Sequence, residues 1–434
     1  MSEKKLDRML SRGVRTGAVE MVYPSGEVRR YGDGSAPVAR LRIADSAAVR
    51  GIWMDPALKV PELYMEGRLV VEEGDLFDFL ILVKKNGARG FVTFPSMALG
   101  VGRMLNGVLR RHLLPERAKR NVAHHYDLDE RLFRLFLDED LQYSCAYYET
   151  GDETLEEAQR KKKRHIAAKM QLEPGRKVLD IGCGWGGMGL YLARVAGVGV
   201  TGVTLAEEQL RVAKERAKAA GMEKDATFLL QDYRKVEGRF DRIVSVGMFE
   251  HVGSQNYDEY FRTIERLLTD DGIAVVHAIV RAKPNRFDAP FIDKYIFPNG
   301  HIPSLGETFP AIEKTKLLVK DVEILTMHYA DTLKEWRKRF HANREAALAL
   351  YDERFFRMWD LYLMASEISF RYGKLANFQI VLTRRHAEAP RSRAYIAAAE
   401  AELAAAEARV DAEIAAGARA PATAPGLDAA GGGA

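Results

Sequence analysis

The 434-residue sequence is poor in cysteine, has no long apolar run and carries little net charge. Its only two cysteines, Cys145 and Cys183, exclude a disulfide framework. The longest apolar run near the start, Leu76–Val83, is broken by Asp78 and is too short to span a bilayer; we expect a core helix there, with a lipid-facing surface as the alternative. A formal net charge of +4 gives no reason to expect a nucleic-acid partner. Because the first residues, MSEKKLDRML, are charged, we expect no signal peptide and a cytoplasmic protein.

The length predicts two domains, followed here by a tail of different composition. Over residues 1–115, short alternating runs such as Val38–Ile43 and Gly67–Val71 indicate a small α+β domain, which we expect to bind lipid. Residues 116–387 carry the main α/β pattern. Residues 388–434 are rich in alanine and predict a helix followed by a disordered end.

The stretch VLDIGCGWGG at 178–187 predicts a strand, a tight glycine turn and the start of a helix. Such a turn binds ligands in open α/β sheets, and Gly182, Gly184 and Gly187 also satisfy the dinucleotide pattern. Asp180 distinguishes between the two classes of cofactor that use such a turn. A carboxylate there would repel the pyrophosphate of a dinucleotide and attract an ammonium group. We therefore favour S-adenosylmethionine (SAM) over a nicotinamide or flavin cofactor, with a turn that binds nothing as the remaining alternative.

Strand and helix patterns alternate after this turn, which predicts a parallel sheet with right-handed crossovers. The arrangement corresponds, by analogy, to the seven-stranded class I methyltransferase sheet (Rossmann-like), with a final antiparallel pair. The predicted strands are Lys177–Ile181, Val198–Thr204, Ala226–Gln231, Asp241–Val246, Ile273–Val280, Val319–Leu325 and Phe378–Arg384. The predicted helices between and beside them are Glu207–Ala220, Tyr257–Leu268, 332–350 and 353–370.

Three stretches outside this pattern each have a structural and a functional interpretation. The basic run Lys161–Arg164 is most simply a solvated helix face, and otherwise attracts an anionic membrane. The segment 281–330, rich in Pro, Gly and aromatic residues, is either the wall of an acyl-chain tunnel or an irregular packing insert. Ile396, Leu403 and Val410 stand seven apart in a helix that packs on the body, packs on a partner helix or, more simply, is solvated.

Five motifs follow one another in the sequence: NVAHHYDLDERLFRLFLDEDLQYSCAYY, VLDIGCGWGG, GVTLAEEQ, DRIVSVGMFEHVG and KYIFPNGHIPS. Together they resemble the cyclopropane-fatty-acyl-phospholipid synthase family, which includes the mycolic acid cyclopropane synthases. Five ordered motifs are far more specific than any one of them, and they cover roughly residues 116–385. The resemblance implies a SAM-dependent C-methyltransferase.

The resemblance also implies the site residues, carried over position by position. Those that would hold a bicarbonate ion acting as the base are Cys145, Glu250, His277, Ile279 and Tyr329. Those that would bind SAM are Tyr143, Ser144, Asp180, Gly182, Gly184, Trp185, Gly186, Thr204, Leu205, Gln209, Asp232 and Tyr233. No metal is expected.

The reaction implied is transfer of the SAM methyl group to a cis double bond of an unsaturated phospholipid acyl chain. Loss of a proton then closes a cyclopropane ring. Methylation without ring closure, a non-catalytic lipid-binding module and methylation of a small soluble metabolite are the alternatives. Such a substrate implies a peripheral location at the inner face of the membrane, and a homodimer is left open.

Overall fold

The structure, a computed structural model, describes residues 2–113, 128–284, 289–298, 300–386 and 390–417. The chain divides into two compact units. Unit 1 comprises Met1–His125, Val280–Gly306 and Thr326–Ala376, and unit 2 comprises Tyr126–Ile279, Glu307–Leu325 and Asn377–Ala434. The domain boundaries expected at residues 115 and 387 lie outside the described residues, so they stay a prediction.

Unit 1 contains a four-stranded sheet in the order β2-β1-β3-β4. β1 (Ala18–Val22) pairs antiparallel with β2 (Val28–Gly32) and parallel with β3 (Val38–Ile43). β3 pairs antiparallel with β4 (Leu69–Glu73). The strand expected over 38–43 is therefore confirmed, the strand expected over 67–71 begins two residues later, and β1 and β2 were not predicted.

The helices of unit 1 come from three separate segments of the chain, and they pack against the sheet and against one another. α16 (Glu353–Arg371) packs against α3 (Pro56–Met65), α4 (Leu76–Asn86) and α14 (His328–Ala342). The core helix expected over 76–83 is confirmed, because α4 buries Leu76, Phe79, Ile81 and Leu82. The single helix expected over 332–350 is wrong, because Asn343 leaves the helical conformation between α14 and α15. The other helices of this unit are α1 (Ser2–Gly13), α2 (Ser46–Met54), η1 (Ala88–Phe91), α5 (Phe94–Leu113), α12 (Pro290–Tyr295) and α15 (Arg344–Leu350).

Unit 2 contains a seven-stranded sheet in the order β10-β11-β9-β8-β5-β6-β7. β9, β8, β5, β6 and β7 run parallel, and β10 pairs antiparallel with β11, which confirms the predicted class I methyltransferase sheet. The strand expected to begin at Ile273 begins at Leu268 instead. The bounds are β5 (Lys177–Ile181), β6 (Gly199–Thr204), β7 (Ala226–Leu230), β8 (Phe240–Val246), β9 (Leu268–Arg281), β10 (Leu318–Leu325) and β11 (Leu375–Thr383).

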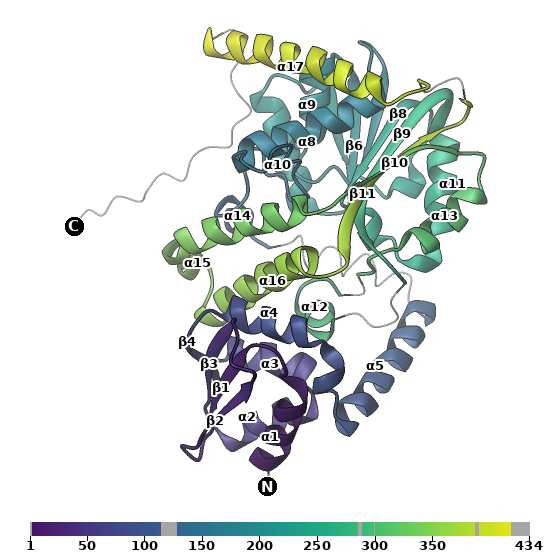
Figure 1. The fold of residues 1–434 in the computed structure, drawn as a ribbon. Coiled ribbons are helices and arrows are strands. Elements are labelled where there is room, and N and C mark those ends of the chain that lie inside the picture. Colours follow the sequence, from purple (N-terminus) through teal and green to yellow (C-terminus); the bar gives the residue numbers. More distant parts are fainter. Residues whose placement is uncertain (1, 114–127, 285–288, 299, 387–389, 418–434) are drawn as a thin grey trace. The chain divides into compact units, whose positions relative to one another are not determined.

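Helices cover both faces of this sheet (Figure 1). α8 (Leu155–Met170), α9 (Gly187–Ala196) and α10 (Glu207–Ala219) lie on one face, and α11 (Tyr257–Leu267) and α13 (Leu305–Glu313) lie on the other. The described part of the segment 281–330 includes α12, α13 and β10, and its function as a tunnel wall stays a prediction. Shorter elements are α7 (Glu130–Arg134), η2 (Tyr233–Lys235), η3 (Phe249–His251) and η4 (Ser254–Asn256).

The basic run on α8 is neither a solvated face nor free to attract a membrane. Lys161 pairs with Glu149 and Glu153, Lys163 with Asp140 and Arg164 with Glu407, and Lys162 is fully buried. Both interpretations of this run are wrong, because its cations are neutralised or enclosed by the chain itself. A capping box between Thr154 and Glu157 fixes the start of the helix that carries them.

The alanine-rich helix α17 (Ala394–Ala415) packs against α8 and α9, so the solvated interpretation is wrong. Ile396 is buried and Leu403 is partly buried against the core. The buried Glu407 accepts hydrogen bonds from Arg164 and from the Tyr191 hydroxyl. The hydrogen bonds of Glu407 therefore add to the few apolar contacts that hold α17 in place. The end expected to be disordered, 418–434, lies outside the described residues.

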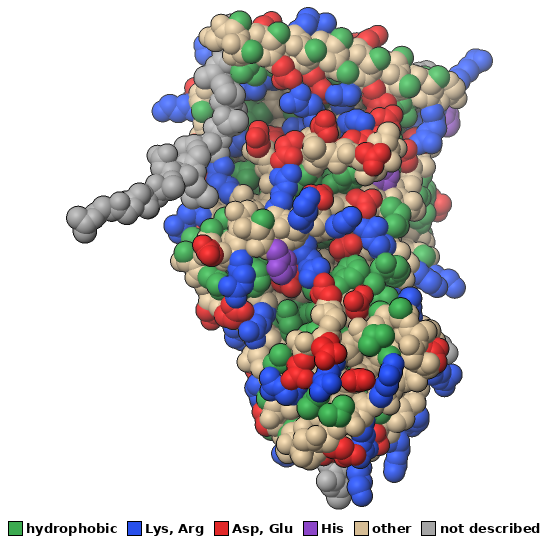
Figure 2. Space-filling view, turned by 60° about the vertical axis from the view of Figure 1, so that its left-hand side comes forward, with side chains coloured by type: hydrophobic (Ala, Val, Ile, Leu, Met, Phe, Trp, Pro, Cys, Tyr) green, Lys and Arg blue, Asp and Glu red, His purple; other side chains and the backbone are tan. Residues whose placement is uncertain are grey.

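Acidic and basic side chains alternate over the surface in Figure 2, with no large area of one sign on the face shown. Within the described ranges, no helix is both long and apolar enough to cross a bilayer.

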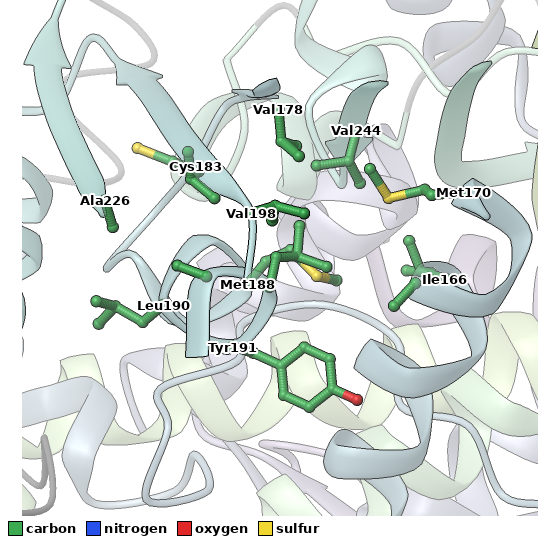
Figure 3. Packing of buried hydrophobic residues seen from close by; sticks show 14 of the residues in the cluster. Ile166, Met170, Val178, Cys183, Met188, Leu190, Tyr191, Val198, Ala226 and Val244 are labelled. Atoms are coloured by element: carbon green, nitrogen blue, oxygen red, sulfur yellow. The ribbon is translucent and has the colours of Figure 1, made fainter. Parts of the chain in front are cut away.

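The core of unit 2 fills the space between the sheet and the helices α8, α9 and α10. Figure 3 shows Ile166 and Met170 of α8 facing Val178 of β5 and Met188 of α9. Phe228 on β7 is fully enclosed and packs against Gly186, which precedes α9, and Gly189 in its first turn. Close-packed interiors leave little room for movement. The packing of this core therefore fixes the position of the glycine turn.

Candidate active site

The glycine turn follows β5 and has the geometry that the sequence predicts. Gly182, Gly184 and Gly186 all have positive φ, at 83°, 53° and 81°. A side chain at Gly182 would collide with Met248, in the loop after β8. Gly186 caps the N-terminus of α9, whose first N–H groups have no partner within the helix. The turn therefore presents backbone donors at the carboxyl edge of the sheet.

Asp180 lies near the end of β5 and is 2% exposed. Its Oδ2 atom has no hydrogen-bond partner among the described residues. Burial raises the pKa of Asp180 to about 7, and the charge of Lys162 opposes the rise. An isolated buried carboxylate is costly, so this position favours a ligand that brings a positive charge. The ammonium group of SAM satisfies that requirement, and a pyrophosphate does not.

Lys162 on α8 is a further residue of this site, and the sequence analysis missed it. Its Nζ donates to Gln142 Oε1 at 2.6 Å and to Ser144 Oγ at 2.7 Å. Burial lowers the pKa of Lys162 to about 8. Lys162 lies four residues after Ala158 and four before Ile166, and both of these lie on the buried face of the helix. That spacing could have predicted its burial.

The segment before α8 places Tyr143 and Ser144 near the turn. Tyr143 lies 6.5 Å from Trp185 between ring centroids, and both rings contact Phe133. Ser144 lies beside Gly247, at the end of β8. Trp185 is 4% exposed, and its Nε1 has no partner among the described residues. Predicted cofactor residues from two separate motifs thus meet at one edge of the sheet.

The remaining predicted cofactor residues follow β6 and β7. Thr204 Oγ1 donates to Gln209 Oε1 at 3.0 Å, and the partly exposed Leu205 follows. Asp232 caps η2 and pairs with Arg234 at 2.7 Å. The Tyr233 ring lies 5.6 Å from that of Tyr260. These positions stand after parallel strands, at the edge where open α/β sheets bind ligands.

Glu250 is the second buried acid at this edge. Its Oε1 accepts a hydrogen bond from the Ile279 backbone N–H at 2.6 Å, and its Oε2 has no partner among the described residues. The β8–β9 ladder ends at the pair Val246 and His277, so the Ile279 N–H is left over for Glu250. Burial raises the pKa of Glu250 to about 7, while the Ile279 N–H opposes the rise.

His277 lies on β9, two residues before Ile279, and is 1% exposed. Its Nδ1 lies 3.1 Å from Gln379 Nε2, and its Nε2 lies 3.4 Å from Asn377 Nδ2. Gln379 and Asn377, both on β11, were not predicted. The structure therefore joins Glu250 to Ile279 directly, and His277 lies two residues away on the same strand.

The other two residues predicted to hold bicarbonate are less closely defined. Cys145 is 1% exposed, and its Sγ lies 3.3 Å from Ala146 O. Tyr329 lies on α14 in unit 1, where its ring contacts those of Trp336 and Phe370. Because the other members belong to unit 2, the place of Tyr329 in the site stays a prediction.

A seven-stranded sheet of this order, with a buried acid at the end of its first strand and a glycine turn behind it, defines a SAM-dependent methyltransferase of class I. Residues 114–380 match the family described as Mycolic acid cyclopropane synthetase, and the chain belongs to this family.

Individual relatives agree with this assignment. The chain is 39% identical over 352 residues to the Cyclopropane-fatty-acyl-phospholipid synthase of Escherichia coli K12, covering 81% of this chain and 89% of that protein. It is 39% identical over 282 residues to the Tuberculostearic acid methyltransferase UfaA1 of Mycobacterium tuberculosis, covering 62% and 66%. The solved structure of the mycolic acid cyclopropane synthase CmaA1 complexed with SAH and CTAB superposes with a TM-score of 0.58, at 34% identity, covering 61% and 97%.

Proposed function

We propose that this enzyme transfers the methyl group of SAM to a cis double bond of an unsaturated phospholipid acyl chain and closes a cyclopropane ring. The observation that carries the proposal is the 39% identity, across 81% of the chain, to a protein named for that reaction. The chemistry of the site supports it, as the following contacts indicate.

The methyl donor and the alkene need positioning and exclusion of water, because an alkene is a weak nucleophile. SAM, when bound, supplies the electrophilic methyl group. Asp180 would accept from its ammonium group, with Tyr143, Trp185 and the glycine turn enclosing the rest. Phe249, fully buried, packs on Tyr257 at 4.4 Å between ring centroids, and such rings stabilise a developing cation.

We assign the proton acceptor to a bound bicarbonate ion, held by Glu250, His277 and the Ile279 region, with Cys145 and Tyr329 as further members. An anion needs donors, and the pKa of Glu250, raised by burial to about 7, leaves about half of its carboxyl groups protonated at neutral pH. The second oxygen can then donate. When bound there, bicarbonate supplies a base that the methyl donor does not consume.

Product analysis tests the proposal. Purified protein is incubated with SAM and vesicles of unsaturated phospholipid, and the extracted lipid is examined by proton NMR. Upfield cyclopropane signals are the expected result. Glu250→Gln should keep SAM binding and lose turnover by about 10²–10⁴-fold, because an amide can donate to the anion but cannot take a proton on from it. Glu237→Gln, an exposed position, serves as the control. Full activity of Glu250→Gln would contradict the role given to Glu250.

A second candidate is methylation without ring closure, favoured by the similarity to the Tuberculostearic acid methyltransferase UfaA1. Both products gain the same mass, so mass spectrometry alone does not separate them. A gain of one CH₂ in lipid mass without cyclopropane signals would select this candidate.

We also propose that the enzyme works at a membrane surface. Several apolar side chains just before α5 and along its N-terminal part are solvent-exposed: Val92, Phe94, Met97, Leu99 and Val101. Clustered exposed apolar side chains of this kind are typical of surfaces that meet protein or lipid. Phe94, 81% exposed, is the most accessible of them.

A further inference from the structure

Behind His277, a row of buried polar side chains runs from β9 through β11 to α8. Lys169 Nζ lies 2.7 Å from Gln379 Oε1, and Gln379 Nε2 lies 3.1 Å from His277 Nδ1. All three residues are at most 1% exposed. Such deeply buried polar groups are expensive unless they are fully paired, so their arrangement has a defined orientation.

Lys169 determines which way the Gln379 amide points. A lysine ammonium group has three donors and no acceptor, so the amide atom beside it must be the oxygen. Lys169 also contacts the Glu323 carboxylate, which requires Nζ to donate there as well. The assignment of Gln379 Oε1 and Nε2 therefore follows from the chemistry of its neighbour.

The Gln379 orientation in turn determines the tautomer of His277. The Gln379 Nε2 group donates, so His277 Nδ1 must accept, and the neutral ring carries its proton on Nε2. Asn377 agrees with this after exchange of its two amide atoms. Its Oδ1, which has no partner among the described residues, would then face Nε2–H. The 3.4 Å separation there is long for a hydrogen bond.

We infer that Gln379, held by Lys169, is a positioning residue that keeps His277 in the Nε2–H tautomer, so that His277 donates a hydrogen bond to an anion and does not take up the proton. That the Nε2–H group of His277 holds an anion rests on the proposed function. The tautomer of His277 does not depend on it. Protonation of His277 would turn Nδ1 into a donor facing the Gln379 amide donor, which disfavours a role as general base.

Nitrogen-15 NMR of the imidazole groups tests the tautomer directly. The chain has 10 histidines, so a His277→Asn variant identifies the signals of His277. In the wild type, Nδ1 should have the shift of an unprotonated nitrogen and Nε2 that of a protonated one. Gln379→Glu places an acceptor against Nδ1 beside Lys169 and should reverse the two shifts. The exposed Gln255→Glu should leave them unchanged.

Kinetics separate positioning from simple damage to the structure. Gln379→Glu should lower kcat by about 10- to 100-fold while the SAM dissociation constant and the melting temperature change little. Lys169→Met, with exposed Lys218→Met as its control, should instead give a mixture of tautomers because the amide can turn over.

Three outcomes would overturn the inference: a protonated Nδ1 in the wild type, unchanged shifts in Gln379→Glu, or reversed shifts with undiminished kcat. A wild-type protein with the Nε2–H tautomer but no cyclopropane product would refute the proposed function and support the tautomer. If Gln379→Glu does not fold, the wild-type spectrum and Lys169→Met decide the question.

Discussion

At the scale of single residues, the site depends on two carboxyl groups that the fold buries without complete partners. Asp180 and Glu250 each have one oxygen with no hydrogen-bond partner among the described residues. Leaving a buried acceptor unsatisfied costs about 1–3 kcal/mol. The folded chain bears this cost, and a ligand that pairs with these oxygens recovers it. Binding energy is thus concentrated where the chemistry is proposed to occur.

Affinity for SAM should depend on pH through Asp180. Its pKa is raised to about 7 by burial, so the carboxyl group is protonated at lower pH. The ionised form is the better acceptor for an ammonium group, so affinity should rise between about pH 5.5 and 7, approaching tenfold per unit at the acid end. Titration calorimetry measures this slope.

The matched variants are Asp180→Asn and the exposed Asp225→Asn. Asp180→Asn should bind SAM about 10- to 100-fold more weakly at pH 7 and lose most of the slope. It should also gain stability near neutral pH, because the stability linked to a raised carboxyl pKa is present below the ordinary value and lost as pH rises through about 7. Undiminished affinity in Asp180→Asn would refute the role given to this acid.

The sequence identifies some of these residues and not others for a physical reason. Asp180 and the glycines could be predicted because strand, turn and helix follow one another locally. Glu250 and His277 required the family resemblance, since each stands alone in its own motif. Lys162 and Gln379 act through contacts with residues 18 and 102 positions away, Ser144 and His277. No local pattern encodes such pairs.

At the scale of elements, α8 carries buried polar side chains. Some of them contact residues of the candidate site, and others contact α17. Lys162 and Lys169 lie beneath the sheet edge, and Arg164 holds Glu407 of α17. His165 lies between Glu323 and Glu400, at 2.6 and 2.7 Å. α17 begins beyond the matched family region, and it packs against α8, which lies within that region.

Glu407 should be the main anchor of α17. Glu407→Ala leaves Arg164 and the Tyr191 hydroxyl without their acceptor, so the free energy of unfolding should fall by about 1–3 kcal/mol. Urea unfolding followed by circular dichroism measures the change. Glu413→Ala, exposed on the same helix, should change it by less than about 0.5 kcal/mol. Equal effects of the two substitutions would contradict the anchoring.

Elements with strong periodicity were predicted well, and elements that depend on tertiary contacts were not. The parallel strands β5, β6, β7 and β8 lie within a residue of their expected limits. Within 281–330 the strand β10 was predicted, but the helices α12 and α13 and the break between α14 and α15 were missed, because short helices and a single non-helical residue leave little local signal. The charged run on α8 was wrongly interpreted as a solvated face, because a run of charged residues is usually exposed but can also be buried against acidic partners.

At the scale of the whole molecule, the proposed contact with a bilayer depends on a mixed-charge surface and on exposed apolar side chains near the start of α5. Figure 2 shows both signs of charge interspersed, so attraction by a basic face has no support there. In our proposal, the exposed apolar side chains from Val92 to Val101 make the contact instead. Its contribution should then be insensitive to salt, since apolar burial is not screened.

Phe94→Asp should reduce binding to vesicles of unsaturated phospholipid. Burying a phenylalanine is worth about 1.5–3 kcal/mol, so partitioning should fall by about 10- to 100-fold. The side chain is 81% exposed, so stability should be unaffected. Vesicle sedimentation measures binding, with Val28→Asp, another exposed apolar position, as the control. Activity on detergent-dispersed lipid should persist. Unchanged vesicle binding would refute the role of this cluster.

The discontinuous course of unit 1 has a consequence for synthesis on the ribosome. α16 packs against α3 and α4, yet it leaves the ribosome about 300 residues after α3, roughly 15–60 s later at ordinary translation rates. Until then, the nascent N-terminal part lacks the helix that covers it. Overproduction without added chaperones should therefore favour aggregates seeded by unfinished chains, and an isolated N-terminal fragment should be a poor reagent for lipid-binding experiments.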